Sequence, residues 1–269
     1  MKTLKKSLLL LTLIAYPLNV LFSQNTSTDE AMKNANNPLA RIKAFNIHNY
    51  YLPSLYASDD ASATQTLFRY AQPIGNVLVR ATLPFETLTP NGDYAEGESK
   101  SITTTGLGDF QVFGAWVFSK KGANELAIGP MFVAPTATDT PLGEGKWQAG
   151  ASFIAFMANN PQFQYGTLLT WQTSFAGDDD REEVSRMVFQ PFGMWQIGGG
   201  VYLRSSAFWT FDFRNGGINI PFSMGIGNVL KVGKTVFNIF TEPQFSAINY
   251  RYNNGAKFQL FTGLNMQFQ

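Results

Sequence analysis

The chain has 269 residues, with 20 basic and 19 acidic side chains, one histidine and no cysteine. Its formal charge of +1 gives no reason to expect a nucleic-acid partner, because binding to the phosphate backbone needs a strongly basic surface. The absence of cysteine excludes both a disulfide framework and a lipid-modified cysteine anchor.

Residues 1–23 are predicted to be a signal peptide. Three lysines precede an apolar run, and the small Ser23 permits cleavage before Gln24. A retained membrane anchor is less favoured, because Pro17 and Asn19 interrupt the run and a helical span needs about 20 apolar residues. Cleavage removes three of the 20 basic residues and no acidic one, so the mature chain carries 17 basic and 19 acidic residues, a formal charge of −2.

Residues 24–38 are polar and show no alternation of apolar and polar side chains. Ser27 and Glu30 have the spacing of a capping box, so a short helix could begin there. Two interpretations stay open for this segment. It is either a periplasmic tail or a plug or latch that enters the barrel described next.

From residue 39 onward, apolar and polar residues alternate with a period of two in segment after segment, which predicts β-strands. The last strand ends one residue before the C terminus on an aromatic side chain, Phe268. Which face of the strands near 124–135 and 146–157 is apolar stays open. About twelve strands are expected, near 40–50, 62–72, 77–86, 110–118, 124–135, 146–157, 162–175, 184–197, 201–212, 218–227, 237–245 and 257–269.

The connections between these strands alternate between short and long, which is the rhythm of membrane barrels with short periplasmic turns and longer outer loops. No later run of about 18 apolar residues occurs, so a transmembrane helix is not expected. In lipid, a closed sheet pairs every backbone group without leaving an edge. The sequence therefore predicts an all-β fold: a transmembrane, antiparallel, up-and-down β-barrel of about 12 strands over residues 39–269.

Two further patterns bear on this barrel. All five tryptophans fall on the apolar parity of their strands, as expected of a lipid-facing aromatic girdle: Trp116, Trp147, Trp171, Trp195 and Trp209. Four prolines lie inside expected strands, and each lacks the N–H needed for the ladder, so bulges or irregularities are expected there: Pro84, Pro191, Pro221 and Pro243.

Several segments resemble a large bacterial family of predicted outer-membrane proteins, often described as transporters or as phenol-degradation meta-pathway proteins. The segments are Asn37-Pro-Leu-Ala40, Thr105-Gly-Leu-Gly-Asp109, Gly129-Pro130 with Pro135-Thr-Ala-Thr138 and Gly143-Glu-Gly-Lys-Trp147, and Phe237-Asn-Ile-Phe-Thr-Glu-Pro-Gln244. The resemblance implies a barrel and a transport role, and it leaves the substrate open. The last strand also resembles the closing strand of outer-membrane β-barrels, and this resemblance implies that the near-terminal Phe268 serves as an assembly signal for the barrel insertion machinery.

Parity places seven charged residues on the lumen face: Arg69, Arg80, Asp109, Arg186, Arg204, Asp212 and Glu242. Both signs occur, so strong ion selectivity is not expected. Counting from the turn at Gly198–Gly200 predicts an ion pair between Arg186 and Asp212. Counting from the loop at 87–104 predicts that Arg80 and Asp109 lie level with each other, with Arg69 opposite Arg80.

The leading functional hypothesis is an outer-membrane channel for passive passage of small, apolar or aromatic molecules. The alternative is a non-conducting structural or binding barrel with a filled lumen, and a barrel enzyme acting on lipid is a weaker third reading. Catalysis is not expected, because the only histidine, His48, has no serine motif beside it.

No cofactor and no metal are expected, because the acidic loop at 178–183 lacks the spacing of a calcium site. The expected partners are outer-membrane lipid and lipopolysaccharide, the barrel assembly machinery and an unidentified small permeant.

Overall fold

The computed structural model describes residues 34–90 and 103–268. The predicted signal peptide and most of the polar segment that follows it lie outside these described residues. Within them, no helix has the length and apolar character needed to cross a membrane.

Fifteen strand segments and one short 3₁₀ turn make up the described chain. In order they are β1 (Lys43–Leu55), β2 (Ser62–Ile74), β3 (Val77–Thr89), β4 (Thr104–Leu107), β5 (Phe110–Lys121), β6 (Asn124–Ala134), η2 (Thr140–Leu142), β7 (Lys146–Met157), β8 (Phe163–Gly177), β9 (Ser185–Gly198), β10 (Val201–Ser205), β11 (Trp209–Asp212), β12 (Gly217–Ser223), β13 (Gly225–Val232), β14 (Thr235–Tyr250) and β15 (Ala256–Phe268).

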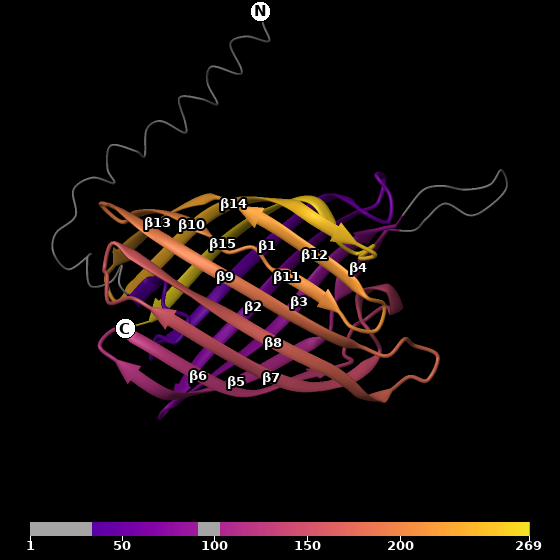
Figure 1. Cartoon of the computed structure of the whole chain (residues 1–269), viewed down its shortest axis with the longest axis horizontal. Coiled ribbons are helices and arrows are strands. Elements are labelled where there is room, and N and C mark those ends of the chain that lie inside the picture. The colour runs from indigo at the N-terminus through magenta and orange to yellow at the C-terminus, as the bar shows by residue number, and fades with distance from the viewer. Residues whose placement is uncertain (1–33, 91–102, 269) are drawn as a thin grey trace, which may run out of the picture.

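The segments form one closed antiparallel barrel (Figure 1). Each strand pairs with its neighbours in the chain, and closure comes from β15, which pairs with β14 on one side and with β1 on the other. Three wall strands are each interrupted once, giving the consecutive segments β4 and β5, β10 and β11, and β12 and β13. The fifteen segments therefore make twelve wall strands, which confirms the predicted barrel.

Each interruption faces a proline on a neighbouring strand. The break between β4 and β5 lies beside Pro84, the break between β10 and β11 lies beside Pro191, and the break between β12 and β13 lies beside Pro243. A register shift also occurs at Pro221 in β12. Because proline has no N–H to donate, the ladder cannot continue on that side. The irregularities predicted at these four prolines are confirmed.

The two ends of the barrel differ as the connection lengths predict. The short turns gather at one end, the left end in Figure 1, and we call it the turn end. The longer connections, including residues 135–145 and 178–184, gather at the other end, which we call the loop end. The first residue of β1, Lys43, pairs with the last residue of β15, Phe268. The start of the barrel and its end therefore both lie at the turn end.

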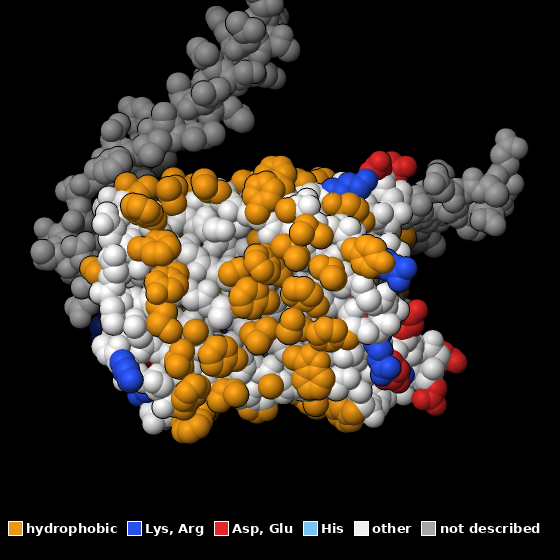
Figure 2. Space-filling view, in the orientation of Figure 1, with side chains coloured by type: hydrophobic (Ala, Val, Ile, Leu, Met, Phe, Trp, Pro, Cys, Tyr) orange, Lys and Arg blue, Asp and Glu red, His pale blue; other side chains and the backbone are white. Residues whose placement is uncertain are grey.

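The outer wall is apolar over its middle, and charged side chains are concentrated at the two ends (Figure 2). Four of the five tryptophans are exposed on this wall: Trp116, Trp147, Trp171 and Trp195. Trp209 is half-buried against Phe189. Exposed apolar side chains at such density are unfavourable in water and match the hydrocarbon layer of a membrane.

The structure also settles the faces of β6 and β7. In β6 the buried side chains are at odd positions, such as Met131 and Val133, and in β7 they are at even positions, such as Ile154 and Phe156. These apolar side chains enter the lumen, where several of them join one cluster. Both strands looked apolar on each face because one face meets lipid and the other fills the barrel.

A matched pair of substitutions tests the membrane-facing wall. Ala151 is exposed near the middle of β7, and Ala176 is exposed near the loop end of β8. Ala151→Arg should lower the unfolding free energy by about 2–4 kcal/mol, because the guanidinium meets the bilayer midplane. Ala176→Arg should cost about 0–1 kcal/mol, because it lies near the interface. Denaturant titration of the barrel refolded in liposomes measures both, and equal costs would contradict this placement of the membrane.

Candidate functional site

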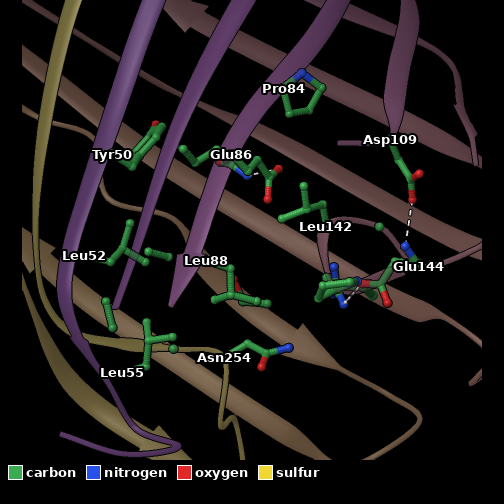
Figure 3. A pocket seen from close by; sticks show the side chains of 18 of the residues that line it. Tyr50, Leu52, Leu55, Pro84, Glu86, Leu88, Asp109, Leu142, Glu144 and Asn254 are labelled. Carbon is green, nitrogen blue, oxygen red and sulfur yellow. Dashed lines mark hydrogen bonds and ion pairs between the residues drawn. The ribbon is translucent and has the colours of Figure 1, made fainter. Parts of the chain in front are cut away.

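A vestibule of about 510 Å³ opens from the lumen at the loop end (Figure 3). One side is apolar and carries Leu52, Leu55 and Leu88. The opposite side carries Asp109 and Glu144. Further polar groups come from glutamine side chains of several strands, namely Gln65, Gln111, Gln148, Gln172 and Gln259. An amphiphilic small molecule would find both an apolar wall and hydrogen-bonding groups in this space.

The loop at 135–145 forms part of this vestibule because Asp109 holds it there. The Asp109 carboxylate accepts hydrogen bonds from the backbone N–H groups of Ala137 at 3.1 Å and Glu144 at 2.8 Å. Gly106 lies against this loop, since an added Cβ would collide with Thr138. Two of the sequence segments that carry the family resemblance, 105–109 and 135–147, therefore form one structural unit.

A second anchor on the same loop is Arg181. Its guanidinium donates to three backbone carbonyls of the loop, those of Thr140, Gly143 and Glu144. Arginine suits this position because its planar group presents several donors at once. The loop is thus fixed from two sides of the barrel, by Asp109 in the break between β4 and β5 and by Arg181 in the β8–β9 connection.

Arg186 and Asp212 face each other across the β9–β11 pair, as the register prediction required. The same register continues to Tyr202 and Gln196, and a bulge at the turn then shifts Val201 onto Gly198 in place of the expected Ile197. The predicted ion pair, however, is wrong. Arg186 binds Glu144 at 2.8 Å.

Asp212 instead accepts hydrogen bonds within its own turn, from the backbone N–H groups of Arg214 and Asn215. The inward-folded loop brings Glu144 within reach of Arg186. Counting residues within strands could not anticipate this contact.

The expected row of Arg69, Arg80 and Asp109 is also wrong. Arg80 pairs with Phe113, so Asp109 lies farther along the barrel toward the loop end. On the other side Arg80 pairs with Ala71, two residues away from Arg69. β3 continues to Thr89 and pairs there with β4, and the break between β4 and β5 shifts the register by one residue, so Asp109 lies near Pro84 and away from Arg80.

Between the vestibule and the turn end, a layer of charged and aromatic side chains crosses the lumen. Its centre is an ion pair in which the Arg204 Nε donates to the Glu242 carboxylate at 2.6 Å, with the two side chains 7% and 0% exposed. The Arg204 guanidinium lies over the Phe240 ring, 3.5 Å from its centroid. Cation–π contact and ion pairing together compensate for removing this charge from water.

Glu242 is fully satisfied by hydrogen bonds. Besides Arg204, its carboxylate accepts from the Ser206 N–H at 2.7 Å, the Ser206 hydroxyl at 2.8 Å and the Gln244 amide at 3.1 Å. Ser206 lies in the break between β10 and β11, where its N–H has no strand partner. The Glu242 side chain thus replaces a missing ladder bond from inside the barrel.

His48 belongs to the same layer, and neighbouring side chains engage both of its ring nitrogens. Arg69 Nη1 lies 2.8 Å from Nδ1, and Nε2 lies 2.7 Å from Asn265 Oδ1. Because arginine only donates, Nδ1 accepts and Nε2 carries the proton. The ring also makes edge contacts with Phe240 and Phe261. This arrangement leaves no free nitrogen to activate a nucleophile.

Residues 34–42 form the segment before β1, and its buried part lies inside the lumen at the turn end. Ala35 packs with Tyr202, Val229 and Val236, and Leu39 is 1% exposed within a second apolar cluster. Polar contacts come from Asn238, which donates to the Ala35 carbonyl at 3.3 Å and to the Asn36 side chain at 2.9 Å.

A smaller cavity of about 150 Å³ separates this segment from the charged layer. It shares no lining residue with the vestibule. Arg80 and Arg204 line the smaller cavity, whereas Asp109 and Arg186 line the vestibule.

Sequence reasoning missed Tyr202 as a member of the lumen network, whereas parity had already placed Ser206 and Asn238 on the polar, inward face of their strands. Tyr202 is fully buried, and its hydroxyl donates to Asn238 at 2.6 Å. It shares the parity of Arg204, which was predicted to face inward, so parity could have found it. Ser206 lies outside the regular strand, and its role depends on the break.

Titratable groups at the loop end have distinct environments. Hydrogen bonds from the Ser174 hydroxyl and from Lys146 lower the pKa of the Glu183 carboxyl. Burial raises the pKa of the Tyr252 phenol in the β14–β15 connection. Within residues 34–90 and 103–268, no cluster of three or more histidine or acidic side chains is arranged to hold a metal ion.

The buried ion pair predicts a strong asymmetry between two substitutions. Glu242→Ala should lower the unfolding free energy by about 3–5 kcal/mol, because it leaves Arg204 buried without a counter-charge. Asp59→Ala removes an ion pair with Lys257 in which Asp59 is 82% exposed, and should cost about 1 kcal/mol or less. Denaturant unfolding of both variants measures the difference, and similar costs would refute the structural importance of the Glu242 network.

Comparison with known proteins places this architecture among outer-membrane channels. The COG4313 outer membrane channel from Pseudomonas putida F1 matches with a TM-score of 0.62 at 14% sequence identity, over 84% of this chain and 96% of that chain. The NanC porin matches with a TM-score of 0.53 at 8% identity, over 84% of this chain and 99% of that chain. No protein-family model matches the chain, and no curated protein does.

At these identities the likeness establishes the fold, and the narrower resemblance to phenol-degradation meta-pathway proteins stays a prediction. A closed β-barrel with an apolar outer wall is one of the few structures that can span a lipid bilayer. The chain therefore has the fold of outer-membrane β-barrels and is located in the outer membrane.

Proposed function

We propose that the protein is a passive channel for small molecules, and that the vestibule at the loop end admits permeants with apolar or aromatic character. The observation that carries this proposal is the vestibule itself, with about 510 Å³ of space and an apolar wall of Leu52, Leu55 and Leu88 facing amide side chains. Such a mixed lining desolvates an apolar body while still pairing its polar group. The channel and porin with similar folds support a passive route.

The proposed route is closed at the turn end by the segment before β1, which acts as a plug. Its polar contacts include Asn37 with Glu125 at 3.1 Å and Gln267 with the Asn34 carbonyl at 3.1 Å. Hydrogen bonds of this kind contribute about 0.5–1.5 kcal/mol each when neutral, and somewhat more with a charged partner. The described part of the segment makes few such hydrogen bonds. Its displacement is therefore compatible with gating on the microsecond-to-second timescale of local opening motions.

The second candidate is a non-conducting barrel with a filled lumen. It is favoured by the charged layer, in which Glu242 and Tyr202 are 0% exposed, and by the lack of shared lining between the two cavities. In that case the vestibule would bind a small molecule without letting it cross the membrane. We further propose that the barrel is not an enzyme, a view supported by the full engagement of the His48 ring.

A reversible tether tests the proposed plug. The chain has no native cysteine, and Asn36 and Asn238 touch through their side chains at 2.9 Å. In the variant Asn36→Cys with Asn238→Cys, a short bis-methanethiosulfonate should lower the conductance of planar bilayers, because each cysteine thiolate displaces a sulfinate and forms a disulfide to the linker. Reduction should then restore the conductance, because the segment regains its freedom to leave the lumen. The two single-cysteine variants treated with the same reagent serve as controls.

The result also separates the two candidates. Conductance that is the same before and after tethering would show that ions pass without movement of the segment. If correctly folded wild-type protein gives no conductance and no uptake of small solutes into liposomes, the channel proposal fails and the filled barrel replaces it.

We also propose that Phe268 contributes to recognition by the barrel assembly machinery, and that lipid and lipopolysaccharide surround the assembled wall. Phe268 is 46% exposed at the end of β15, facing outward beside the seam with β1. Phe268→Ser should lower the amount of heat-modifiable barrel in outer-membrane fractions. Phe258→Ser, an aromatic change on the same strand far from the terminus, is the matched control, and equal yields for the two variants would remove the special role of Phe268.

A further inference from the structure

The smaller cavity at the turn end collects buried polar atoms that have no partner. Four such atoms line it: Asn36 Nδ2, Asn46 Oδ1, Arg80 Nε and Gln267 Oε1. Asn36 and Gln267 are 9% and 6% exposed. Buried polar groups without hydrogen bonds are costly, so their concentration around one small space points to a molecule that binds there.

The charge of this cavity is positive. Arg80 and Arg204 line it, and none of the described residues that line it is acidic. Two carboxylates that bind lining residues of the cavity are engaged there, Glu242 with Arg204 and Glu125 with Asn37, and Glu125 also pairs with Lys120.

Of the two described arginines that line the cavity, Arg204 is paired with Glu242 and Arg80 has no ion-pair partner. Its guanidinium lies over the Phe113 ring, 4.2 Å from the centroid, and among the described residues it makes no hydrogen bond or ion pair. Arg69, its neighbour in the layer, is occupied by His48. A guanidinium buried without an anion is unfavourable, and an anionic ligand would remove that cost.

The size and donor set of the cavity define the ligand. A space of about 150 Å³ holds on the order of five water molecules, which suits a compact ligand. Arginine forks recognise the oxygens of carboxylates and phosphates. The amide of Asn46 presents a donor when rotated by half a turn, because its oxygen and nitrogen ends are interchangeable in shape, and Asn36 Nδ2 is a donor without a partner.

We propose that this cavity is a binding site for one compact oxyanion, a carboxylate or a phosphate group, held by Arg80 and Arg204 and closed by Asn36. Asn36 belongs to the segment before β1, so the bound anion touches both the wall and the proposed plug. A ligand that binds only when the segment is in place stabilises that state. Anion binding therefore favours the closed lumen, and this consequence alone rests on the proposed channel function.

Binding is measured by calorimetry on the purified full-length barrel in an uncharged detergent, with inorganic phosphate in one arm and acetate in the other, at constant ionic strength. Wild-type protein should show saturable binding of one anion per barrel in at least one arm, and the arms distinguish phosphate from carboxylate. Arg80→Gln should weaken binding roughly tenfold to a hundredfold, because it removes the charged donors. Lys121→Gln, which removes an exposed cation at the turn end, should leave binding unchanged.

A second variant keeps the test decisive if Arg80→Gln does not fold. Asn46→Leu fills the cavity from β1 and should abolish binding, while heat-modifiable gel mobility verifies the barrel. Wild-type protein that binds neither anion, or Arg80→Gln protein that is folded and binds as tightly as wild type, would overturn the proposal and leave water as the occupant.

Bilayer recordings separate this proposal from the channel function. Phosphate should lower the wild-type conductance relative to chloride of equal ionic strength and should not affect Arg80→Gln. Calorimetric binding without any conductance would uphold the anion site and reject the channel. Conductance without calorimetric binding would uphold the channel and reject the anion site.

Discussion

The requirement that every backbone N–H and C=O find a partner in lipid governs this structure. Closure of β15 onto β1 removes the sheet edges, and the apolar outer wall follows from the medium that surrounds it. Prolines disturb the ladder at several points, and the structure responds by interrupting the adjacent strand. At the break after β10, the freed N–H of Ser206 is taken by Glu242 from inside the barrel. The lumen chemistry is therefore coupled to the integrity of the wall.

That coupling explains why the middle of the lumen is dense. Glu242 must be buried to reach Ser206, and a buried carboxylate needs a cation, which Arg204 supplies. Arg204 in turn lies on Phe240, and Phe240 and Phe261 enclose His48. In this layer, each buried polar or charged group contacts the next, and each contact offsets part of the cost of removing that group from water. Among the described residues, the vestibule lies on one side of this layer and the smaller cavity on the other.

The two cavities differ in how they are built. At the loop end, Asp109 and Arg181 hold an inward-folded loop through backbone contacts, so the vestibule has a fixed rim with mixed polarity. At the turn end, the wall of the cavity is completed by the segment before β1, whose described residues are held by a few hydrogen bonds and by the packing of Ala35 and Leu39 in two apolar clusters. A fixed rim suits selection of a permeant, whereas a weakly held wall suits opening and closing.

Much of this architecture was determined by the sequence alone. A period of two assigns each residue to a face, so the strand number, the outward tryptophans and the inward charges were all readable, and the facing of Arg186 and Asp212 followed from a short turn. The sequence does not determine the register of two strands that are joined by a long loop. For this reason the position of Asp109 along the barrel axis was predicted wrongly, level with Arg80. Contacts across the lumen were decided only by the tertiary structure: Glu144 took the place of Asp212 beside Arg186, and Glu242 met Arg204 across β13. The physical reason is that parity depends on local backbone geometry, whereas partners inside a barrel depend on closure, register and inward-folded loops, which join residues far apart in the chain.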